Sequence, residues 1–277
     1  MSILTAFLIV GGIALVLGVL LALISYFFAV PEDPTKAKIR ACLPGVNCGA
    51  CGYTGCDDYA AALAEGGVKP SLCVPGAQAV ADEIAAILGV ESEAFEDVVA
   101  YVACNGHCGV TQNKADYEGV QTCAAATMLY GGPGACTHGC LGYGDCAAAC
   151  PVGAICTIDG IAHVDTSRCI GCGVCVKTCP KGVIRMLPQK AQVTVQCNNK
   201  DKGADARKAC QNACIGCKKC EKVCPNGAIT VTDNLAFIDY AKCTGCGVCL
   251  DNCPAGCIKH TYFPNLPEGV TAEDLMN

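Results

Sequence analysis

Most of the 28 cysteines of this 277-residue chain fall into runs with one repeated spacing. In each run, four cysteines are separated by two, two and three residues, and proline follows directly, giving C-x2-C-x2-C-x3-C-P. The pattern occurs at Cys169, Cys172, Cys175, Cys179 and Pro180, at Cys214, Cys217, Cys220, Cys224 and Pro225, and at Cys243, Cys246, Cys249, Cys253 and Pro254. A [4Fe–4S] cluster needs one thiolate for each of its irons, and runs of this spacing supply them. The sequence therefore predicts several such clusters, whose chemistry is electron transfer.

Dense cysteine has two other common uses, and both fit less well. Disulfide scaffolds are usually short secreted domains, whereas this chain is long and its first residues lack the basic start of a secretion signal. Zinc sites commonly combine paired C-x2-C units, often with histidine, and only four histidines are present. Reduced cysteines at this density also indicate a reducing cytoplasm.

The repeated run predicts which cysteines act together. In two-cluster proteins with this spacing, the fourth cysteine of a run binds the other cluster. We therefore expect three ligand sets: Cys214, Cys217 and Cys220 with Cys253; Cys243, Cys246 and Cys249 with Cys224; and Cys169, Cys172 and Cys175 with Cys150.

A fourth, degenerate run leaves its ligand set incomplete. Cys140, Cys146 and Cys179 are available, but Tyr143 stands where the repeat predicts cysteine. We expect Cys136 as the replacement, because it lies four residues before Cys140. The alternatives are a three-iron cluster or a ligand from Cys104, Cys108 or Cys123, and a sixth cluster using some of Cys104, Cys108, Cys123, Cys197 and Cys210 is also open. Cys42, Cys156 and Cys257 are expected to be small buried apolar residues.

The first cysteine block has a different spacing, C-x2-C-x4-C-x16-C. Its glycine-rich sequence NCGACGYTGCDDYAAAL allows tight wrapping of the backbone, and a helix is predicted to begin near Asp57. Cys48, Cys51, Cys56 and Cys73 therefore predict a further [4Fe–4S] site, with zinc as the alternative. Five clusters are expected in total.

The elements that must position these cysteines repeat as well. A shift of 74 residues takes nine cysteines between 123 and 179 onto cysteines between 197 and 253, which indicates duplication of a two-cluster module. GAICTIDGIAHVD in the first copy and GAITVTDNLAFID in the second both predict β-hairpins. Ahead of the modules, apolar spacing predicts one helix with Ile84, Ile87 and Leu88 on a face, and a second short helix with Phe95, Val98, Val99 and Val102.

Residues 1–31 carry no charged side chain and are almost wholly apolar from position 3 to 30. A helix of this length would reach about 40 Å, enough to cross a bilayer, with aromatic residues at 26–28 in the interface. The basic residues at 36–40 follow, so the positive-inside rule places the cysteine-rich part on the cytoplasmic side. A buried helix of a soluble protein is the alternative.

The predicted fold is α+β, with a single N-terminal transmembrane helix, a small helical iron–sulfur domain and two tandem ferredoxin-like modules of the bacterial type. We expect an anchor at 1–30, a linker at 31–41, the N-terminal cluster domain at 42–76, a helical connecting region at 77–122, modules at 123–190 and 191–260, and a tail at 261–277.

The order of these blocks resembles the B subunit of the Rnf complexes, in the long multi-cluster form found in anaerobes. LPGVNCGACGYTGC follows one membrane segment, and CTHGCLGYGDCAAACP precedes the two modules. The resemblance implies a cell-membrane complex that oxidises reduced ferredoxin, reduces NAD and moves Na⁺ or H⁺. It implies that this subunit takes electrons from soluble ferredoxin. Tyr143 and the additional cysteines depart from the family pattern.

The chain shows no nucleotide-binding pattern of its own. Glycine-rich pieces such as GGPGAC lack the strand–GxGxxG–helix context, so flavin and NAD sites and the ion path are expected in partner subunits. No basic stripe with interleaved aromatics is present, which argues against nucleic acid. An electron-transfer subunit of another membrane oxidoreductase is the second interpretation. A non-redox scaffold or sensor is the third, although a sensor needs only one cluster.

Charge near the runs predicts where a partner docks. We expect soluble ferredoxin, an acidic protein, to bind the duplicated modules, with the Cys48–Cys73 cluster on the membrane side. The lysines that flank the runs and would steer it are Lys177, Lys181, Lys218, Lys219 and Lys222.

Overall fold

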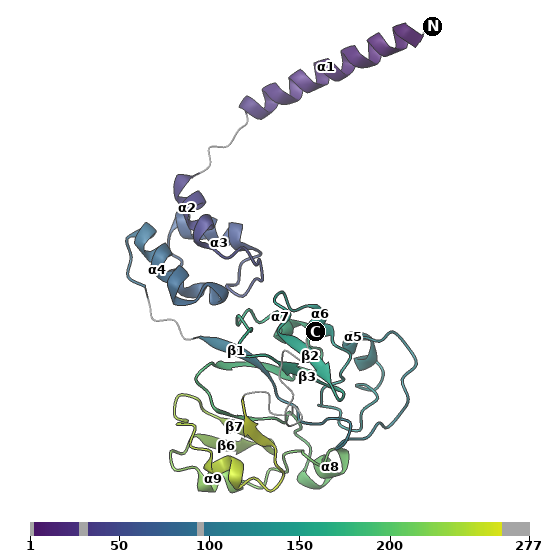
Figure 1. Ribbon diagram of the computed structural model, residues 1–277, viewed down its shortest axis with the longest axis vertical. Helices are drawn as coiled ribbons and strands as arrows, with labels where there is room; N and C mark the ends of the chain where they lie inside the picture. Colours follow the sequence, from purple (N-terminus) through teal and green to yellow (C-terminus); the bar gives the residue numbers. More distant parts are fainter. Residues whose placement is uncertain (1–2, 28–32, 93–96, 262–277) are drawn as a thin grey trace.

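The computed structural model describes residues 3–27, 33–92 and 97–261 (Figure 1). The predicted tail and Phe95 lie outside these residues. The helices are α1 (Ile3–Phe27), α2 (Pro34–Cys42), α3 (Cys56–Glu65), α4 (Ala77–Leu88), α5 (Cys123–Thr127), α6 (Asp145–Ala148), α7 (Val174–Thr178), α8 (Gly203–Ala209), α9 (Lys219–Val223) and α10 (Val248–Asp251), with 3-10 turns η1 (Pro70–Leu72) and η2 (Val74–Gly76). The strands are β1 (Val98–Val102), β2 (Ile155–Ile158), β3 (Ile161–Val164), β4 (Ile184–Pro188), β5 (Val193–Val195), β6 (Ile229–Thr232), β7 (Leu235–Ile238) and β8 (Ile258–His260).

Three helices form the small N-terminal domain. Helix α2 begins after Asp33, whose carboxylate accepts a hydrogen bond from the backbone N–H of Thr35 (2.8 Å), as N-capping residues do. Helices α2, α3 and α4 bury Ile39, Leu63 and Ile84 together. The predicted helix near Asp57 is α3, and the predicted apolar face of α4 is buried at Ile84. The domain therefore begins at α2 rather than at residue 42, so part of the predicted linker is helical.

The region predicted as a helical connection contains a strand instead of its second helix. β1 pairs antiparallel with β4, in a register that places Val102 opposite Ile184. The β-branched and aromatic residues of VVAYV favour a strand, and β4 supplies the partner that a helix would not need. The first module therefore takes its outer strand from residues ahead of 123.

The two modules have the same architecture. Each has a two-stranded hairpin, β2–β3 or β6–β7, and a second two-stranded sheet, β1–β4 or β5–β8. The hairpins were predicted, and a shift of 74 residues takes the bounds of β2 and β3 onto those of β6 and β7. Their tight turns use Asp159-Gly160 and Asp233-Asn234, all with positive φ, as two-residue hairpin turns require.

A close backbone approach fixes one cysteine loop against each hairpin turn. A Cβ at Gly142 would come within 2.4 Å of the Gly160 carbonyl oxygen. At the equivalent position in the second module, a Cβ at Gly216 would come within 2.9 Å of Asn234 Cα. Both glycines also have positive φ, so larger residues would displace these loops.

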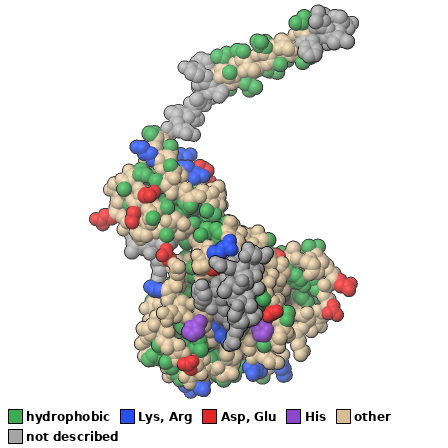
Figure 2. All heavy atoms as spheres, viewed as in Figure 1, with side chains coloured by type: hydrophobic (Ala, Val, Ile, Leu, Met, Phe, Trp, Pro, Cys, Tyr) green, Lys and Arg blue, Asp and Glu red, His purple; other side chains and the backbone are tan. Residues whose placement is uncertain are grey.

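Helix α1 stands apart from the domains in Figure 1. Its described side chains run from Leu8 to Ile24 and include exposed leucines, valines and isoleucines, which Figure 2 shows along the helix. Judged on the described residues alone, no helix of the chain has the length and apolar run needed to cross a membrane. The predicted transmembrane helix is therefore unconfirmed, and the side chains of the aromatic residues at 26–28 lie outside the described part.

Candidate iron–sulfur sites

The N-terminal domain brings its four predicted ligands to one place. Burial raises the pKa of Cys73 to about 11, and the thiols of Cys56, Cys48 and Cys51 lie close enough to add to the rise. The loop is fixed where α3 begins, because Asn47 Oδ1 accepts a hydrogen bond from the backbone N–H of Cys56 (2.8 Å). The quartet predicted from the first cysteine block thus lies together.

The crossed pairing of the duplicated runs also appears in the structure. In the second module, one cavity is lined by Cys214, Cys217, Cys220 and Cys253, and another by Cys224, Cys243, Cys246 and Cys249. In the first module, burial raises the pKa of Cys175 to about 12, and Cys169, Cys172 and Cys150 add to the rise. Each of these fourth cysteines therefore lies with the three cysteines of the other run.

Backbone N–H groups point at several of these sulfurs. The N–H of Ala154 donates to Cys150 Sγ, and the N–H of Ala228 donates to Cys224 Sγ, both over 3.3 Å. The N–H of Ala100 in β1 donates to Cys169 Sγ (3.4 Å). Such donors favour the thiolate and tune the potential of a bound cluster, so the strands contribute to the sites as well as to the core.

In the structure, Cys123 rather than Cys136 lies with all the cysteines of the degenerate run. Cys123 lines a cavity with Cys140, Cys146 and Cys179, whereas Cys136 lines a larger cavity that it shares with Cys140 but not with Cys146 or Cys179. Burial is the main cause that raises the pKa of Cys123, and a backbone hydrogen bond from Tyr143 partly offsets it. Cys123 therefore reaches the slot where the repeat would have a cysteine at position 143. Cys123 belongs to the short helix α5 and was one of the alternatives that the sequence left open beside Cys136.

Asp145 holds α5 in this position. Its two carboxylate oxygens accept hydrogen bonds from the backbone N–H groups of Cys123 (2.8 Å) and Ala124 (3.0 Å). Asp145 is also the first residue of α6, which contains Cys146. One carboxylate thus ties the helix that carries Cys123 to the helix that carries another member of the quartet.

Cys257, predicted to be an apolar filler, is buried between two predicted ligands. Its sulfur lies 3.6 Å from Cys253 Sγ. Hydrogen bonding among these thiols raises the pKa of Cys257 and lowers the pKa of Cys253 and Cys214. With Cys253 and Cys214 held by iron as thiolates, Cys257 would be the one of the three that keeps a proton to donate. Val183 occupies the equivalent position of the first module, so only the second module has this thiol donor.

The donor sets fit iron–sulfur clusters. Each quartet supplies four sulfurs, one for each iron, and thiols such as Cys146 and Cys220 are buried in apolar surroundings. Among the described residues, no group of three or more potential ligands is arranged to hold a single metal ion. A cubane holds its thiolates on separate corners, so they stand further apart than the ligands of one ion.

Neighbouring quartets lie side by side across the domain boundary. Burial is the main cause that raises the pKa of Cys172, and Cys48 of the N-terminal domain also contributes. At the same boundary, Lys177 Nζ donates a hydrogen bond to the carbonyl oxygen of Gly49 (3.0 Å). The N-terminal quartet therefore adjoins the first quartet of the duplicated modules.

Two ferredoxin-type modules and a helical four-cysteine domain define a multi-cluster iron–sulfur protein of electron transfer. Two family models match the chain: "Putative Fe-S cluster" at residues 43–75, and "4Fe-4S dicluster domain" at residues 168–228 and 213–257. The B subunit of the Na⁺-translocating ferredoxin:NAD⁺ oxidoreductase complex of Acetobacterium woodii is 43% identical over 85% of this chain and 71% of its own length. The B subunit of the proton-translocating ferredoxin:NAD⁺ oxidoreductase complex of Clostridium ljungdahlii is 45% identical over 83% of this chain and 82% of its own length. The B subunit of an ion-translocating oxidoreductase complex of Methanosarcina acetivorans is 40% identical over 85% of this chain and 89% of its own length.

The chain belongs to the B subunits of the ion-translocating ferredoxin:NAD⁺ oxidoreductase, or Rnf, complexes. It is thus an iron–sulfur electron-transfer subunit of an oxidoreductase that has several subunits, as the resemblance predicted. The 4Fe–4S domains agree with this placement.

Proposed function

We propose that this chain is the electron-input subunit of its complex: it takes electrons from soluble reduced ferredoxin and passes them to partner subunits that hold flavin and NAD. The observation that supports this most directly is the adjacency of the quartets, from Cys48 beside Cys172 in the first module to the crossed sets within each module. A sensor or scaffold would not need several neighbouring sites. The relatives from Acetobacterium and Clostridium are named for different ions at similar identity, so identity to them favours neither Na⁺ nor H⁺.

Five [4Fe–4S] sites follow from the quartets that lie together. The proposed ligand sets are Cys48, Cys51, Cys56 and Cys73; Cys150, Cys169, Cys172 and Cys175; Cys123, Cys140, Cys146 and Cys179; Cys214, Cys217, Cys220 and Cys253; and Cys224, Cys243, Cys246 and Cys249. When bound, each cluster accepts and releases one electron. The chain's own residues provide thiolates, direct N–H groups at sulfur and exclude water from the buried thiols.

We also propose that residues 1–30 anchor the chain in the cell membrane, with the cysteine-rich part in the cytoplasm. The support is the uncharged apolar sequence of residues 1–31 and the exposed apolar side chains of α1. Deletion of residues 1–32 is expected to release the chain from the membrane fraction of cells that lack the partner subunits. Retention of the truncated chain in that fraction would contradict the anchor.

The lysines that flank the runs divide into two groups. Lys177 and Lys181 donate to carbonyl oxygens of Gly49 and Gly131, so they hold neighbouring loops together. Lys218, Lys219 and Lys222 are exposed beside the second-module quartet that contains Cys217, which is itself exposed. We therefore propose this surface, rather than all five lysines, as the place where an acidic ferredoxin docks.

The backbone at Lys218 supports the same surface. Gly144, Gly173 and Gly247 stand two residues before the third cysteine of the other three runs and have positive φ. Lys218 stands at the fourth such position and adopts φ 58°, a conformation that lysine rarely takes. A lysine kept at a strained glycine position suggests that its charge is needed there.

The test is the rate at which reduced ferredoxin bleaches the visible absorption of the full-length, cluster-loaded chain, measured by anaerobic stopped flow at several ionic strengths. Lys218→Glu with Lys219→Glu should lower the second-order rate constant by about 10-fold at low salt and reduce its salt dependence. Lys36→Glu with Lys38→Glu makes the same charge change on α2 and should leave the rate unchanged. Failure of ferredoxin to bleach the unaltered chain would refute the function, whereas equal rates in both variants would refute only the docking surface.

A further inference from the structure

A cavity of about 390 Å³ lies where the two modules meet, and five cysteines outside the five proposed sites line it. Cys108 is exposed, and the other four are Cys104, Cys136, Cys197 and Cys210. Neither of the two family models matches the part of the chain that contains Cys104 and Cys136. Three of the four thiols are buried, and Cys136 is half-buried. The cavity is large enough to be a ligand site.

Cys104 and Cys197 occupy equivalent positions in the two modules. Val102 pairs with Ile184 in the first module, and Val195 pairs with Ile258 in the second. Since Ile184 and Ile258 are related by the shift of 74 residues, Val102 corresponds to Val195, and the cysteine two residues further on corresponds as well. The match of Cys123 to Cys197 by sequence offset is therefore not a structural equivalence.

The sulfurs of these two cysteines receive the same hydrogen bonds. Cys104 Sγ accepts from the backbone N–H of Gly106 and of Cys140, both over 3.4 Å. Cys197 Sγ accepts from the backbone N–H of Asn199 (3.5 Å) and of Cys214 (3.3 Å). Cys140 and Cys214 are themselves related by the 74-residue shift, as are Cys136 and Cys210. The cavity thus has two equivalent pairs of thiols, one pair from each module.

Small and polar groups keep the four sulfurs near one another. A Cβ at Gly106 would lie 3.5 Å from both Cys104 Sγ and Cys210 Sγ, and a Cβ at Gly139 would lie within 3.7 Å of the sulfurs of Cys104 and Cys136. Asn199, which is buried, donates its side-chain N–H to Cys136 Sγ (3.5 Å).

One buried polar atom at the same cavity has no partner. Asn105 lines the cavity and is 4% exposed, and its Oδ1 has no hydrogen-bond partner among the described residues. A buried amide oxygen without a partner indicates that a polar group is missing from the site. The amide nitrogen and oxygen of asparagine can exchange places, and in the exchanged orientation this amide would offer N–H donors to a sulfide.

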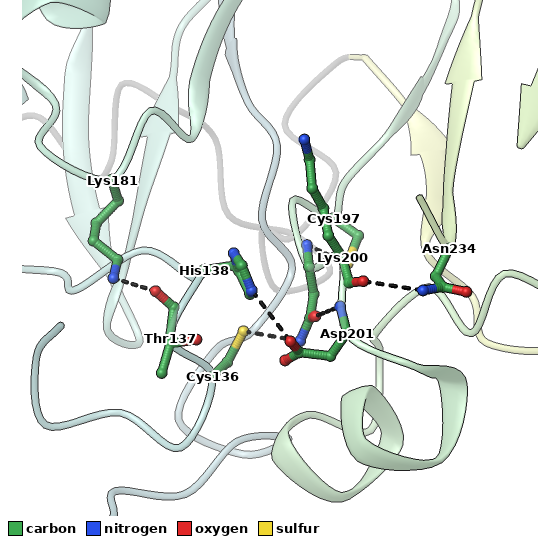
Figure 3. A network of polar contacts seen from close by, with 9 residues as sticks. Cys136, Thr137, His138, Lys181, Cys197, Lys200, Asp201 and Asn234 are labelled. Carbon is green, nitrogen blue, oxygen red and sulfur yellow. Dashed lines mark hydrogen bonds and ion pairs between the residues drawn. The ribbon is translucent and has the colours of Figure 1, made fainter. Parts of the chain in front are cut away.

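Polar contacts hold the two modules together around the cavity. His138 Nε2 of the first module lies 3.4 Å from Asp201 Oδ1 of the second (Figure 3). Within the first module, Lys181 Nζ donates to the carbonyl oxygen of Thr137 and so fixes the loop next to Cys136. Asn212 donates its side-chain N–H to the carbonyl oxygen of Asn105 (3.1 Å). These contacts fix the first-module thiols against the second-module thiols, so the quartet does not depend on a loosely held interface.

We propose that Cys104, Cys136, Cys197 and Cys210 bind a sixth [4Fe–4S] cluster, which lies between the two modules. The cluster takes one iron to each thiolate, as in the other five sites. Its position beside Cys140 on one side and Cys214 on the other places it between the nearest quartets of the two modules. As a relay it would accept one electron from one neighbouring cluster and give one electron to the other. No bond is made or broken beyond the change in iron oxidation state. The relay role rests on the function proposed above, but the existence of the site does not.

The proposal also explains the departure from the family pattern at Tyr143. The segment from Cys104 to Cys136 is 19 residues longer than the equivalent segment from Cys197 to Cys210. The longer segment contains α5 with Cys123. Cys123 fills the slot lost at Tyr143, so Cys136 is left free for the junction. Six quartets then use all the cysteines except Cys42, Cys108, Cys156 and Cys257.

Iron and acid-labile sulfide should be counted on the full-length chain, reconstituted anaerobically, together with the EPR spin count after reduction by dithionite. Six clusters require about 24 irons per chain. Cys210→Ala and Cys197→Ala should each lose about four irons and one spin, and the double variant should lose no more than either single variant. Cys108→Ala removes a thiol that lines the same cavity but lies outside the quartet, and it should keep the full count.

The site would be refuted by about 20 irons in the unaltered chain, or by quartet variants that keep all the iron of the unaltered chain. Loss of eight or more irons in the double variant would also refute a shared site. If a variant fails to fold, the count of the unaltered chain still decides. Iron content does not depend on the electron donor, so the result stands whether or not ferredoxin proves to reduce the chain.

Discussion

Cys257→Val tests whether a thiol donor sets the two modules to different potentials. The substitution places in the second module the residue that the first has at Val183, and both positions are buried. It removes the S–H donor next to Cys253 and Cys214 without removing a proposed ligand. A hydrogen bond to a ligand sulfur stabilises the reduced, more negative cluster. The midpoint potential of the site held by Cys214, Cys217, Cys220 and Cys253 should therefore fall.

The expected shift follows from the strength of one weak donor. Cys257 has one proton and can donate it to either Cys253 or Cys214 at any moment. A hydrogen bond from such a weak donor stabilises its acceptor by on the order of 0.5–1 kcal/mol. For a one-electron couple about 59 mV corresponds to a factor of ten, or about 1.4 kcal/mol. The potential should thus fall by roughly 20–40 mV.

The assay is an anaerobic redox titration of the full-length chain followed by EPR. The signal of this site is assigned from the spectrum that disappears in Cys253→Ala. Val183→Cys is the reciprocal variant, and it should raise the potential of the site held by Cys123, Cys140, Cys146 and Cys179 by a similar amount. Iron content should be unchanged in both. An unchanged or raised potential in Cys257→Val with full iron content would show that the thiol does not act as a donor to the bound cluster.

Further outcomes follow from the same sites. Cys253→Ala should lose the cluster held by Cys214, Cys217 and Cys220 and keep the one in its own run, as crossed ligation requires; EPR or a structure showing the opposite loss would contradict the assignment. Asp145→Ala should weaken the Cys123 site by about 2 kcal/mol, because two N–H groups lose a charged acceptor. Iron release to a chelator from that site should then be roughly 30-fold faster, Asp145→Asn should have a smaller effect, and equal release from all three proteins would refute the role. Lys218→Gly should relieve the positive φ and stabilise the cluster-loaded chain by about 1 kcal/mol while slowing reduction by ferredoxin; a loss of stability would argue against strain. Removal of the clusters should unfold the modules, because thiolate–iron bonds supply folding free energy that small cores lack; a cooperative thermal transition in cluster-free protein by circular dichroism would be evidence against this.

The features that sequence predicted well were those set by local chemistry. The hairpins at Asp159-Gly160 and Asp233-Asn234 follow from turn residues that accept positive φ. The quartets that contain Cys224 and Cys253 follow from a spacing that repeats without change. The start of α3 follows from the composition of the segment after Cys56. In each case the decisive residues lie close together in the chain or in one repeated motif.

The features that sequence missed depend on contacts between distant segments. β1 was predicted as a helix, although Val98, Val99, Tyr101 and Val102 favour a strand once β4 lies beside them. The numerical match of Cys123 to Cys197 concealed the equivalence of Cys104 and Cys197. A signal was present: Cys104 and Cys197 each follow a valine by two residues and precede an asparagine.

Module boundaries show the same limit of sequence patterns. The first dicluster match, 168–228, joins the run at Cys169–Cys179 to the run at Cys214–Cys224. The strands instead close the first module at β4 and begin the second at β5. Because the runs share one spacing, a linear sequence pattern groups runs that follow one another in the chain. The pairing of the strands decides which runs belong to the same module.

The pairing of β1 with β4 has a consequence for synthesis of the chain. Val98 lies opposite Pro188, so the sheet of the first module cannot close until ninety further residues have left the ribosome. At about 5–20 residues per second this takes roughly 5–20 s. Helices α2–α4 lie within residues 34–88 and can pack during that time. The nascent first module therefore keeps its cysteines unassembled for longer than the N-terminal domain does, and cluster insertion into it has to wait for the later part of translation.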